Sequence, residues 1–142
     1  MKPQIAITLP VRDLERSKAF FAGLGFAFDA RFGSEQGAAM IVSRDITVML
    51  AAEAVARTLC AKPMADPRSS RIALLCLFCD SRAEVDAMAG KALALGGALP
   101  EPVEDHGNMY QHGFEDLDGH MWALTCIESM PGQQAAAEDA TV

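Results

Sequence analysis

The chain carries one structural pattern twice, and this duplication constrains its fold more than any other feature. In each half, a short apolar segment leads into a helical pattern. The first helical pattern follows Asp13 and ends at Gly25, and the second follows Asp80 and ends at Gly96. The two starts are 67 positions apart and the two ends are 71 positions apart. A near-constant offset indicates a repeated supersecondary unit rather than two unrelated domains.

Both helices have local start and stop signals. Asp13 suits an N-cap, and Gly25 suits the left-handed position that ends a helix. Ser81 and Glu84 form a capping box before the second helix. Asp118-Gly119 predicts a two-residue hairpin turn. Strands are expected at 4–10, 26–32, 37–43, 46–51, 71–79, 99–105, 108–115 and 120–127.

These elements predict an α+β fold in which two βαβββ repeats form a U-shaped, eight-stranded curved sheet around a cleft. A chain of 142 residues with 51% hydrophobic content can bury one core. We therefore expect one domain over 1–129, with repeats at about 3–58 and 71–128 and a linker at 59–70. The tail at 130–142 has small and acidic residues and is expected to be disordered. A ligand is expected in the cleft between the repeats.

Composition and charge exclude several classes of function. The formal net charge is −7, whereas nucleic-acid binding requires clustered Lys and Arg, so no nucleic-acid partner is expected. The N-terminus has no charged leader followed by an apolar core, and no apolar run approaches 18 residues. We therefore expect a cytoplasmic protein with no membrane partner.

Two strings carry a resemblance to a known superfamily. The first is LPVRDLERS at 9–17, followed by Phe20-Phe21 and by LGF at 24–26, and the second runs from Asp105 to Trp122. Together they resemble the opening and the last hairpin of the vicinal oxygen chelate superfamily, which includes glyoxalases, extradiol dioxygenases and bleomycin-resistance proteins. The resemblance covers about residues 3 to 127. It implies two paired βαβββ units around a U-shaped cleft, the glyoxalase/bleomycin-resistance/dihydroxybiphenyl dioxygenase fold.

The resemblance also implies where a metal would be held. Enzymes of this superfamily use four ligands, two from each repeat, and the corresponding positions here are Ala6, Met49, Leu74 and Ala123. Divalent metals in such sites need imidazole or carboxylate donors. The four side chains offer nothing beyond the weak thioether of Met49. We therefore expect no metal and no cofactor.

Strand alternation predicts which side chains line the cleft. If Asp118-Gly119 is a two-residue loop, Ala123 lies opposite Phe114 and Thr125 lies opposite His112. Alternate residues then share the cleft side. This gives a mostly apolar ligand-binding set, suited to a small organic molecule: Thr8, Met40, Met49, Leu74, Cys76, Tyr110, His112, Phe114 and Ala123.

Several of these residues also have a plain structural interpretation. His112 can be a hydrogen-bonded wall residue, and Tyr110 can pack with its hydroxyl at the surface. His120 flanks a turn and is expected to be solvated. Cys76 and Cys79 are three apart on a strand and point to opposite faces, so the sequence does not predict chelation or a disulfide between them.

The sequence favours a glyoxalase/bleomycin-resistance-like protein that binds a small organic molecule without a metal. One alternative is a glyoxalase-like lyase or a dioxygenase-like enzyme with a non-standard active site, for which no catalytic residue is assigned. Another is a structural or regulatory dimer whose cleft is closed by side chains. A homodimer is expected in any case, because members of this superfamily usually complete their clefts by pairing across a two-fold axis.

Overall fold

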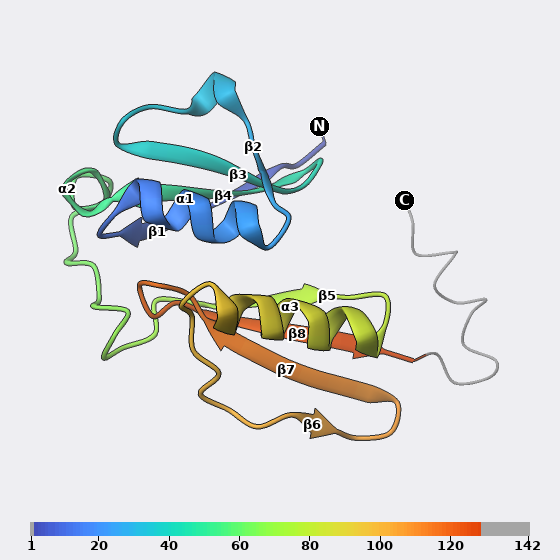
Figure 1. Cartoon of the computed structure of the whole chain (residues 1–142). Coiled ribbons are helices and arrows are strands. Elements are labelled where there is room, and N and C mark those ends of the chain that lie inside the picture. The colour runs from blue at the N-terminus through green and yellow to red at the C-terminus, as the bar shows by residue number, and fades with distance from the viewer. Residues whose placement is uncertain (1, 129–142) are drawn as a thin grey trace.

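The computed structural model describes residues 2–128, in which two modules have the same order of elements (Figure 1). The N-terminal module contains β1 (Ile5–Val11), α1 (Leu14–Gly23), β2 (Ala27–Phe28), the 3₁₀ helix η1 (Ala30–Phe32), β3 (Gly37–Ser43), β4 (Ile46–Ala52) and α2 (Glu53–Ala56). The C-terminal module contains β5 (Leu74–Phe78), α3 (Arg82–Ala94), β6 (Glu104–Asp105), β7 (Met109–Glu115) and β8 (Met121–Ile127). Each module is a βαβββ unit, which confirms the predicted repeat and the α+β class.

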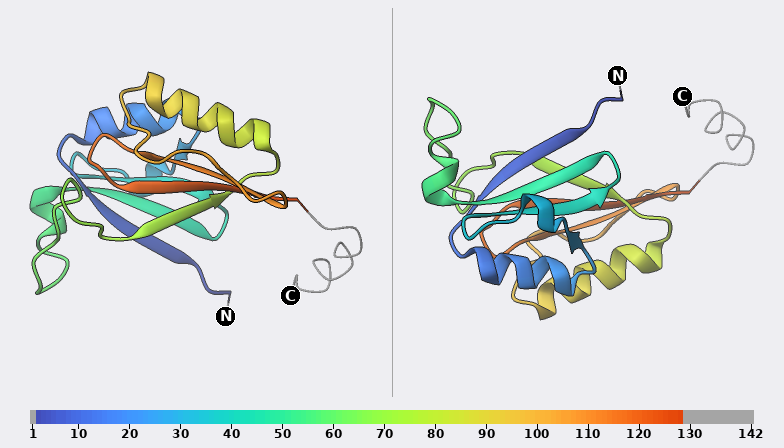
Figure 2. Two further views of the ribbon diagram at one scale, coloured as in Figure 1. Left: turned by 90° about the horizontal axis from the view of Figure 1, so that it is seen from below. Right: turned by 90° about the horizontal axis from the view of Figure 1, so that it is seen from above.

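The eight strands form two four-stranded sheets with the same topology. Their orders are β1-β4-β3-β2 and β5-β8-β7-β6. The first strand of each module runs parallel to the last, and the other neighbours are antiparallel. Helices α1 and α3 lie on the same side of the strands in both views of Figure 2. We call the side of each sheet that faces these helices the helix face, and the other side the open face.

The helix boundaries follow the sequence signals. Asp13 caps α1 by accepting a hydrogen bond from the backbone N–H of Arg16, and Gly25 takes a φ of 104°. Ser81 caps α3 by accepting from the backbone N–H of Glu84. A left-handed residue after each helix favours glycine, because a Cβ atom is strained there. The predicted caps are confirmed.

One hydrophobic core joins the two modules. Phe20 and Phe21 of α1 reach across to the C-terminal sheet. The Phe20 ring centroid lies 6.0 Å from that of Phe114, and the Phe21 centroid lies 5.2 Å from that of Trp122. Phe114 and Trp122 stack on each other and are buried. Helix α1 therefore packs against both sheets, which holds the modules in a defined relative position.

Two predicted strands are much shorter in the structure. The strand expected at 26–32 ends at Phe28, because the Asp29 carboxylate accepts hydrogen bonds from Arg31 and starts a 3₁₀ turn. The strand expected at 99–105 is reduced to Glu104–Asp105. Pro100 and Pro102 have no N–H to donate to a ladder. Helix α2 was not predicted.

The remaining expectations concern the membrane and the tail. Among residues 2–128, no helix has the length and apolar character needed to cross a bilayer. The tail predicted to be disordered, 130–142, lies outside the described residues.

The last hairpin has a different register from the predicted one. Glu115 pairs with Met121, Gly113 with Ala123 and Gln111 with Thr125. The connection therefore spans residues 116–120 rather than two residues. The prediction that Ala123 faces Phe114 is wrong by one position, and a shift of one residue reverses the face of every side chain on β7 relative to β8.

Candidate functional site

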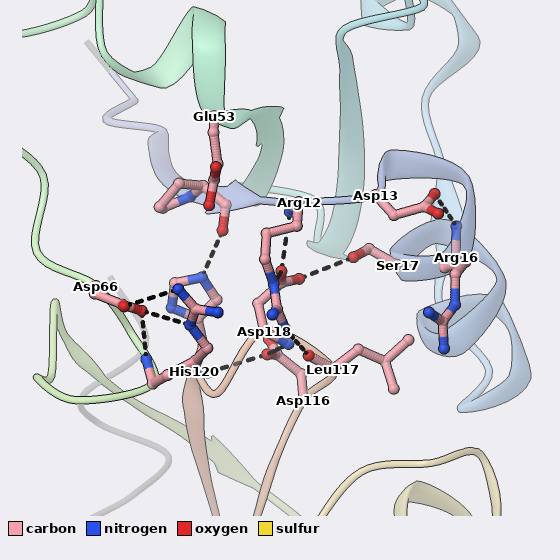
Figure 3. Close-up of polar contacts among 12 residues, drawn as sticks. Arg12, Asp13, Arg16, Ser17, Glu53, Asp66, Asp116, Leu117, Asp118 and His120 are labelled. Atoms are coloured by element: carbon pink, nitrogen blue, oxygen red, sulfur yellow. Dashed lines mark hydrogen bonds and ion pairs between the residues drawn. The ribbon is translucent and has the colours of Figure 1, made fainter.

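The turn at 116–120 connects the two modules through hydrogen bonds (Figure 3). The Asp118 carboxylate accepts hydrogen bonds from the backbone N–H and Nε of Arg12 and from the Ser17 hydroxyl. The Arg12 guanidinium also donates to the Leu117 carbonyl at 2.8 Å. These contacts tie the C-terminal turn to the end of β1 and the start of α1.

The same turn is stabilised from within by buried polar groups. Asp116 accepts hydrogen bonds from the backbone N–H groups of Asp118 and His120 and from the indole N–H of Trp122. Burial raises the pKa of the Asp116 carboxyl, and the hydrogen bonds oppose that shift. His120 Nε2 lies 2.7 Å from the Pro10 carbonyl oxygen, which can only accept, so Nε2 carries the hydrogen. His120 is 4% exposed, and the expectation that it is solvated is wrong.

Five of the nine predicted ligand-binding residues lie on the open face. In the N-terminal sheet, Thr8 pairs with Met49. In the C-terminal sheet, Leu74 pairs with Met121, and Cys76 pairs with Ala123. The position of these five residues on the open face agrees with the prediction from strand alternation. Whether these residues contact a ligand remains a prediction.

The other four predicted residues lie on the helix face, so their assignment to the cleft side is wrong. Met40 pairs with Val48 and is buried in the core. Phe114 is buried against Trp122. The Tyr110 hydroxyl donates to Asp86 of α3, and His112 pairs with Leu124. Tyr110, His112 and Phe114 were assigned to the wrong face because the predicted register of the last hairpin is wrong by one residue. Met40 was assigned to the wrong face because β3 pairs with β4 in a register that puts Met40 opposite Val48.

The four positions that correspond to the metal ligands of the superfamily's enzymes do not suit a metal in this chain. Ala6, Met49, Leu74 and Ala123 all lie on the open faces, but they provide no imidazole or carboxylate donor. Among residues 2–128, no three His, Cys, Asp or Glu side chains gather in a way that could hold an ion. The donor set at these positions therefore does not fit the divalent metal that the superfamily resemblance implies.

A groove of about 560 Å³ separates the two modules on one side of β5. We call it the inter-module groove. Its N-terminal wall consists of Leu24, Phe26, Val42, Ser43 and Ile46. Its C-terminal wall consists of the end of β5 with the following loop, 76–80, and of Glu84, Ala87, Met88 and Lys91 from α3. The groove lies between the two repeats, but the end of α1 and helix α3 help to line it, so it is not the cleft over the strand faces that alternation predicts. Of the nine predicted residues, Cys76 lines the groove.

The chemistry of the groove is mainly apolar. Cys76 Sγ lies 3.2 Å from the Thr125 hydroxyl oxygen, so the two groups can share a hydrogen bond. Burial raises the pKa of the Cys79 thiol, and the negative charge of Glu84 adds to the shift. A neutral thiol is a poor nucleophile. The thiol of Cys79 is therefore better suited to contact a ligand than to attack one.

Most groove residues were missed by the sequence analysis. Strand alternation identifies the two faces of a sheet but not a space beside its edge strand. Phe26 follows a helix C-cap, and Met88 belongs to the apolar stripe of α3. The sequence pattern around each residue therefore predicts a side chain buried in the core rather than one that lines a groove. The groove arises from the docking of one module on the other, and no local pattern encodes that docking.

A smaller cavity of about 120 Å³ lies on the open face of β7 and β8. It is lined by 111–113 of β7, by Met121 and Ala123 of β8, and by Glu101, Pro102 and Glu104 from the neighbouring edge. Two of the nine predicted residues, His112 and Ala123, are among them. Its size is below the range of ligand pockets, about 300–1,000 Å³. The inter-module groove is therefore the stronger candidate.

Comparisons with known proteins agree with this architecture. The family model described as Glyoxalase/Bleomycin resistance protein/Dioxygenase superfamily matches residues 4–124. Hypothetical protein SA1046 from S. aureus has a similar structure, with a TM-score of 0.76 and 24% identity over 89% of this chain and 95% of that chain. A comparison with curated proteins found no significant match.

Two further solved structures are similar. A glyoxalase/bleomycin resistance protein/dioxygenase family enzyme from Burkholderia phytofirmans PsJN has a TM-score of 0.71 and 16% identity over 89% of this chain and 99% of that chain. The fosfomycin resistance protein FosX from Listeria monocytogenes has a TM-score of 0.64 and 19% identity over 89% of this chain and 93% of that chain. At these identities, the likeness supports the fold and assigns no activity.

Proposed function

Because this chain belongs to the Glyoxalase/Bleomycin resistance protein/Dioxygenase superfamily, we propose that it is a small-molecule-binding protein whose ligand lies in the inter-module groove. One observation carries the proposal: both modules contribute apolar walls to a groove of about 560 Å³. Ligand pockets have volumes of about 300–1,000 Å³ and are lined mainly by apolar side chains with a few polar groups. The groove meets both conditions.

The charges in the groove restrict the class of ligand. Asp80 and Glu84 lie on the C-terminal wall and outnumber the basic Lys91. The chain also has a formal charge of −7. An anionic ligand meets a net negative surface there, whereas a neutral or cationic molecule does not. We therefore assign the groove to a neutral or cationic, largely apolar organic molecule.

A titration with a neutral solvatochromic dye tests this assignment. Nile red should show a blue-shifted, saturable emission increase with one dye bound per chain. An anionic dye of similar size should bind more weakly, and added salt should reduce that difference because it screens the acidic wall. A Nile red signal that never saturates, or a tighter fit to the anionic dye, would count against the proposed ligand class.

We also propose that binding is independent of metal. The support is the donor set at Ala6, Met49, Leu74 and Ala123, which contains no imidazole or carboxylate. Elemental analysis of purified protein should find far less than one zinc, nickel, iron or manganese per chain. A chelator should leave the dye affinity unchanged. Stoichiometric metal together with chelator-sensitive binding would reject this part of the account.

The protein is further proposed to be a homodimer that pairs through the open face of β5. Leu74 is 75% exposed and Phe78 is 71% exposed, and both point to that face. Large apolar side chains exposed on the same face of a strand are typical of interfaces. Sedimentation should give a mass of two chains, and Leu74→Asp should shift it towards the 15.1 kDa of one chain. Sedimentation of the wild type as a monomer at micromolar concentrations would exclude the dimer.

A further inference from the structure

Strand β5 has a free edge. It is the outer strand of the C-terminal sheet, whose order is β5-β8-β7-β6, and among residues 2–128 no second strand pairs with it. Just after β5, the backbone N–H of Cys79 donates to the Thr125 carbonyl of β8 at 2.8 Å. Successive residues of a strand direct their backbone N–H and C=O groups to opposite edges. Those of Cys76 and Phe78 therefore point away from β8.

The free edge of β5 lies along the inter-module groove. Residues 76–79 all line the groove. Neighbouring side chains of a strand point to opposite faces of the sheet, so a groove in contact with four successive residues follows the edge of the strand rather than one face. The backbone groups of Cys76 and Phe78 are therefore polar groups in a mainly apolar groove. An extended peptide satisfies such groups by adding a strand to the sheet.

Charged side chains mark the two ends of this edge. Asp80 and Glu84 lie just beyond the end of β5, where the Glu84 carboxylate accepts a hydrogen bond from the backbone N–H of Asp80 at 2.7 Å. Helix α3 then runs in the direction opposite to β5 (Figure 1) and carries Lys91 into the groove. Glu84 and Lys91 are seven residues apart on α3, which is about 10 Å along the helix axis. The groove thus has an acidic end and a basic end.

The separation of these charges matches the length of a tripeptide. An extended residue spans about 3.3 Å, so three residues place an N-terminal ammonium and a C-terminal carboxylate about 10 Å apart. Opposite charges attract, so the ammonium is favoured at Asp80 and Glu84 and the carboxylate at Lys91. A peptide in this orientation runs antiparallel to β5. It carries no net charge, which agrees with the neutral ligand class proposed for the groove.

We propose that the inter-module groove binds an apolar peptide of about three residues with both ends free, as an added antiparallel strand on β5. This inference rests on the proposed function, because it names the ligand class of the same groove. The peptide side chains contact the apolar walls, which include Phe26, Val42 and Met88. An added strand extends the sheet in its own plane, so it leaves the open face of β5 to the proposed dimer.

Isothermal titration calorimetry with the tripeptide Val-Ala-Val tests the added strand. The tripeptide should bind once per chain and should displace Nile red. Methylation of the amide nitrogen of its second or of its third residue gives two matched probes, because only one of these N–H groups can face β5. One methylated peptide should bind at least about fivefold more weakly than the parent, and the other within about twofold. Two methylated peptides of equal affinity would overturn the proposal.

Two variants test the orientation of the peptide. Glu84→Gln keeps an oxygen that can accept the N–H of Asp80 but removes the charge, and Lys91→Met removes the ammonium. Each should weaken binding of the free tripeptide by about threefold. The effect of Glu84→Gln should vanish for the N-acetylated peptide, and that of Lys91→Met for the C-terminal amide. Lys62→Met, at another exposed lysine, is the control and should leave the affinity unchanged. Losses that persist with the capped peptides would contradict the assigned orientation.

Nile red separates a failure of this inference from a failure of the proposed function. Saturable binding of the dye without binding of the free tripeptide would reject the peptide and leave the proposed function standing. Absence of both would reject the proposed function as well. Circular dichroism of each variant confirms that it is folded.

Discussion

Asp118 accepts two hydrogen bonds from Arg12, one from its backbone N–H at 2.9 Å and one from Nε at 3.2 Å, across 106 positions of sequence. A third bond comes from the hydroxyl of Ser17. All three donors belong to the N-terminal module and the acceptor belongs to the C-terminal module. The inter-module groove has one wall from each module, so this contact helps to set the width of the groove.

Replacing Asp118 with alanine should therefore destabilise the whole chain. The variant loses three hydrogen bonds at a buried carboxylate, but Arg12 is partly exposed, so the ion pair itself adds little. We expect a loss of about 2 to 3 kcal/mol in the free energy of unfolding. Urea unfolding followed by the fluorescence of Trp122, the one tryptophan, measures it.

Glu15→Ala is the control for this prediction. Glu15 is exposed and forms an ion pair with Lys18 at 3.8 Å on the same helix, and its removal should change stability by less than about 0.5 kcal/mol. Equal effects of the two substitutions would show that the turn does not join the modules as described.

Phe114 was predicted to contact a ligand, and its position now predicts a stability effect instead. Its ring is fully buried between Phe20 and Trp122. Phe114→Ala should cost about 3 to 5 kcal/mol, through lost burial and the cavity left behind. Phe32→Ala, at an exposed ring, should cost less than about 1 kcal/mol. Thermal unfolding of both variants distinguishes a core residue from a ligand contact.

Tyr110 is the one tyrosine of the chain, so its ionisation can be followed by absorbance alone. Its hydroxyl donates to Asp86, and this hydrogen bond raises the pKa of Tyr110 above 10.0. The protonated form is favoured in the folded state. The associated stability is therefore present below the pKa of an unfolded tyrosine and is lost as pH rises through the folded value.

A spectrophotometric titration of Tyr110 near 295 nm should accordingly give a midpoint above 10.0, and Asp86→Ala should move it down. An unchanged midpoint in that variant would mean that the Tyr110–Asp86 hydrogen bond does not form in solution.

The repeat, the helices and their caps could be predicted from the sequence because their signals are local. Asp13, Gly25, Ser81 and Gly96 each act within one turn of their own helix. Alternation also placed Thr8 of β1 and Leu74 and Cys76 of β5 on the open face, in agreement with the observed strand pairing.

The register of the last hairpin could not be predicted from the pair Asp118-Gly119. Asp116 accepts from the backbone N–H groups of Asp118 and His120, and this capping extends the turn to 116–120. The alternation within β7 carried a signal for the correct face: Phe114 is apolar, whereas Gly113 and Glu115 are small or charged. The inter-module groove had no such signal, because it depends on tertiary docking.

The central claim is that the inter-module groove binds the ligand, and a bulky side chain placed in it tests this claim most directly. Ala87 and Ala94 are both exposed on α3, but only Ala87 lines the groove. In titrations with Nile red, Ala87→Trp should weaken binding by at least tenfold, about 1.4 kcal/mol, and Ala94→Trp should leave it within about twofold. Wild-type affinity in Ala87→Trp, or an equal loss in both variants, would contradict the account.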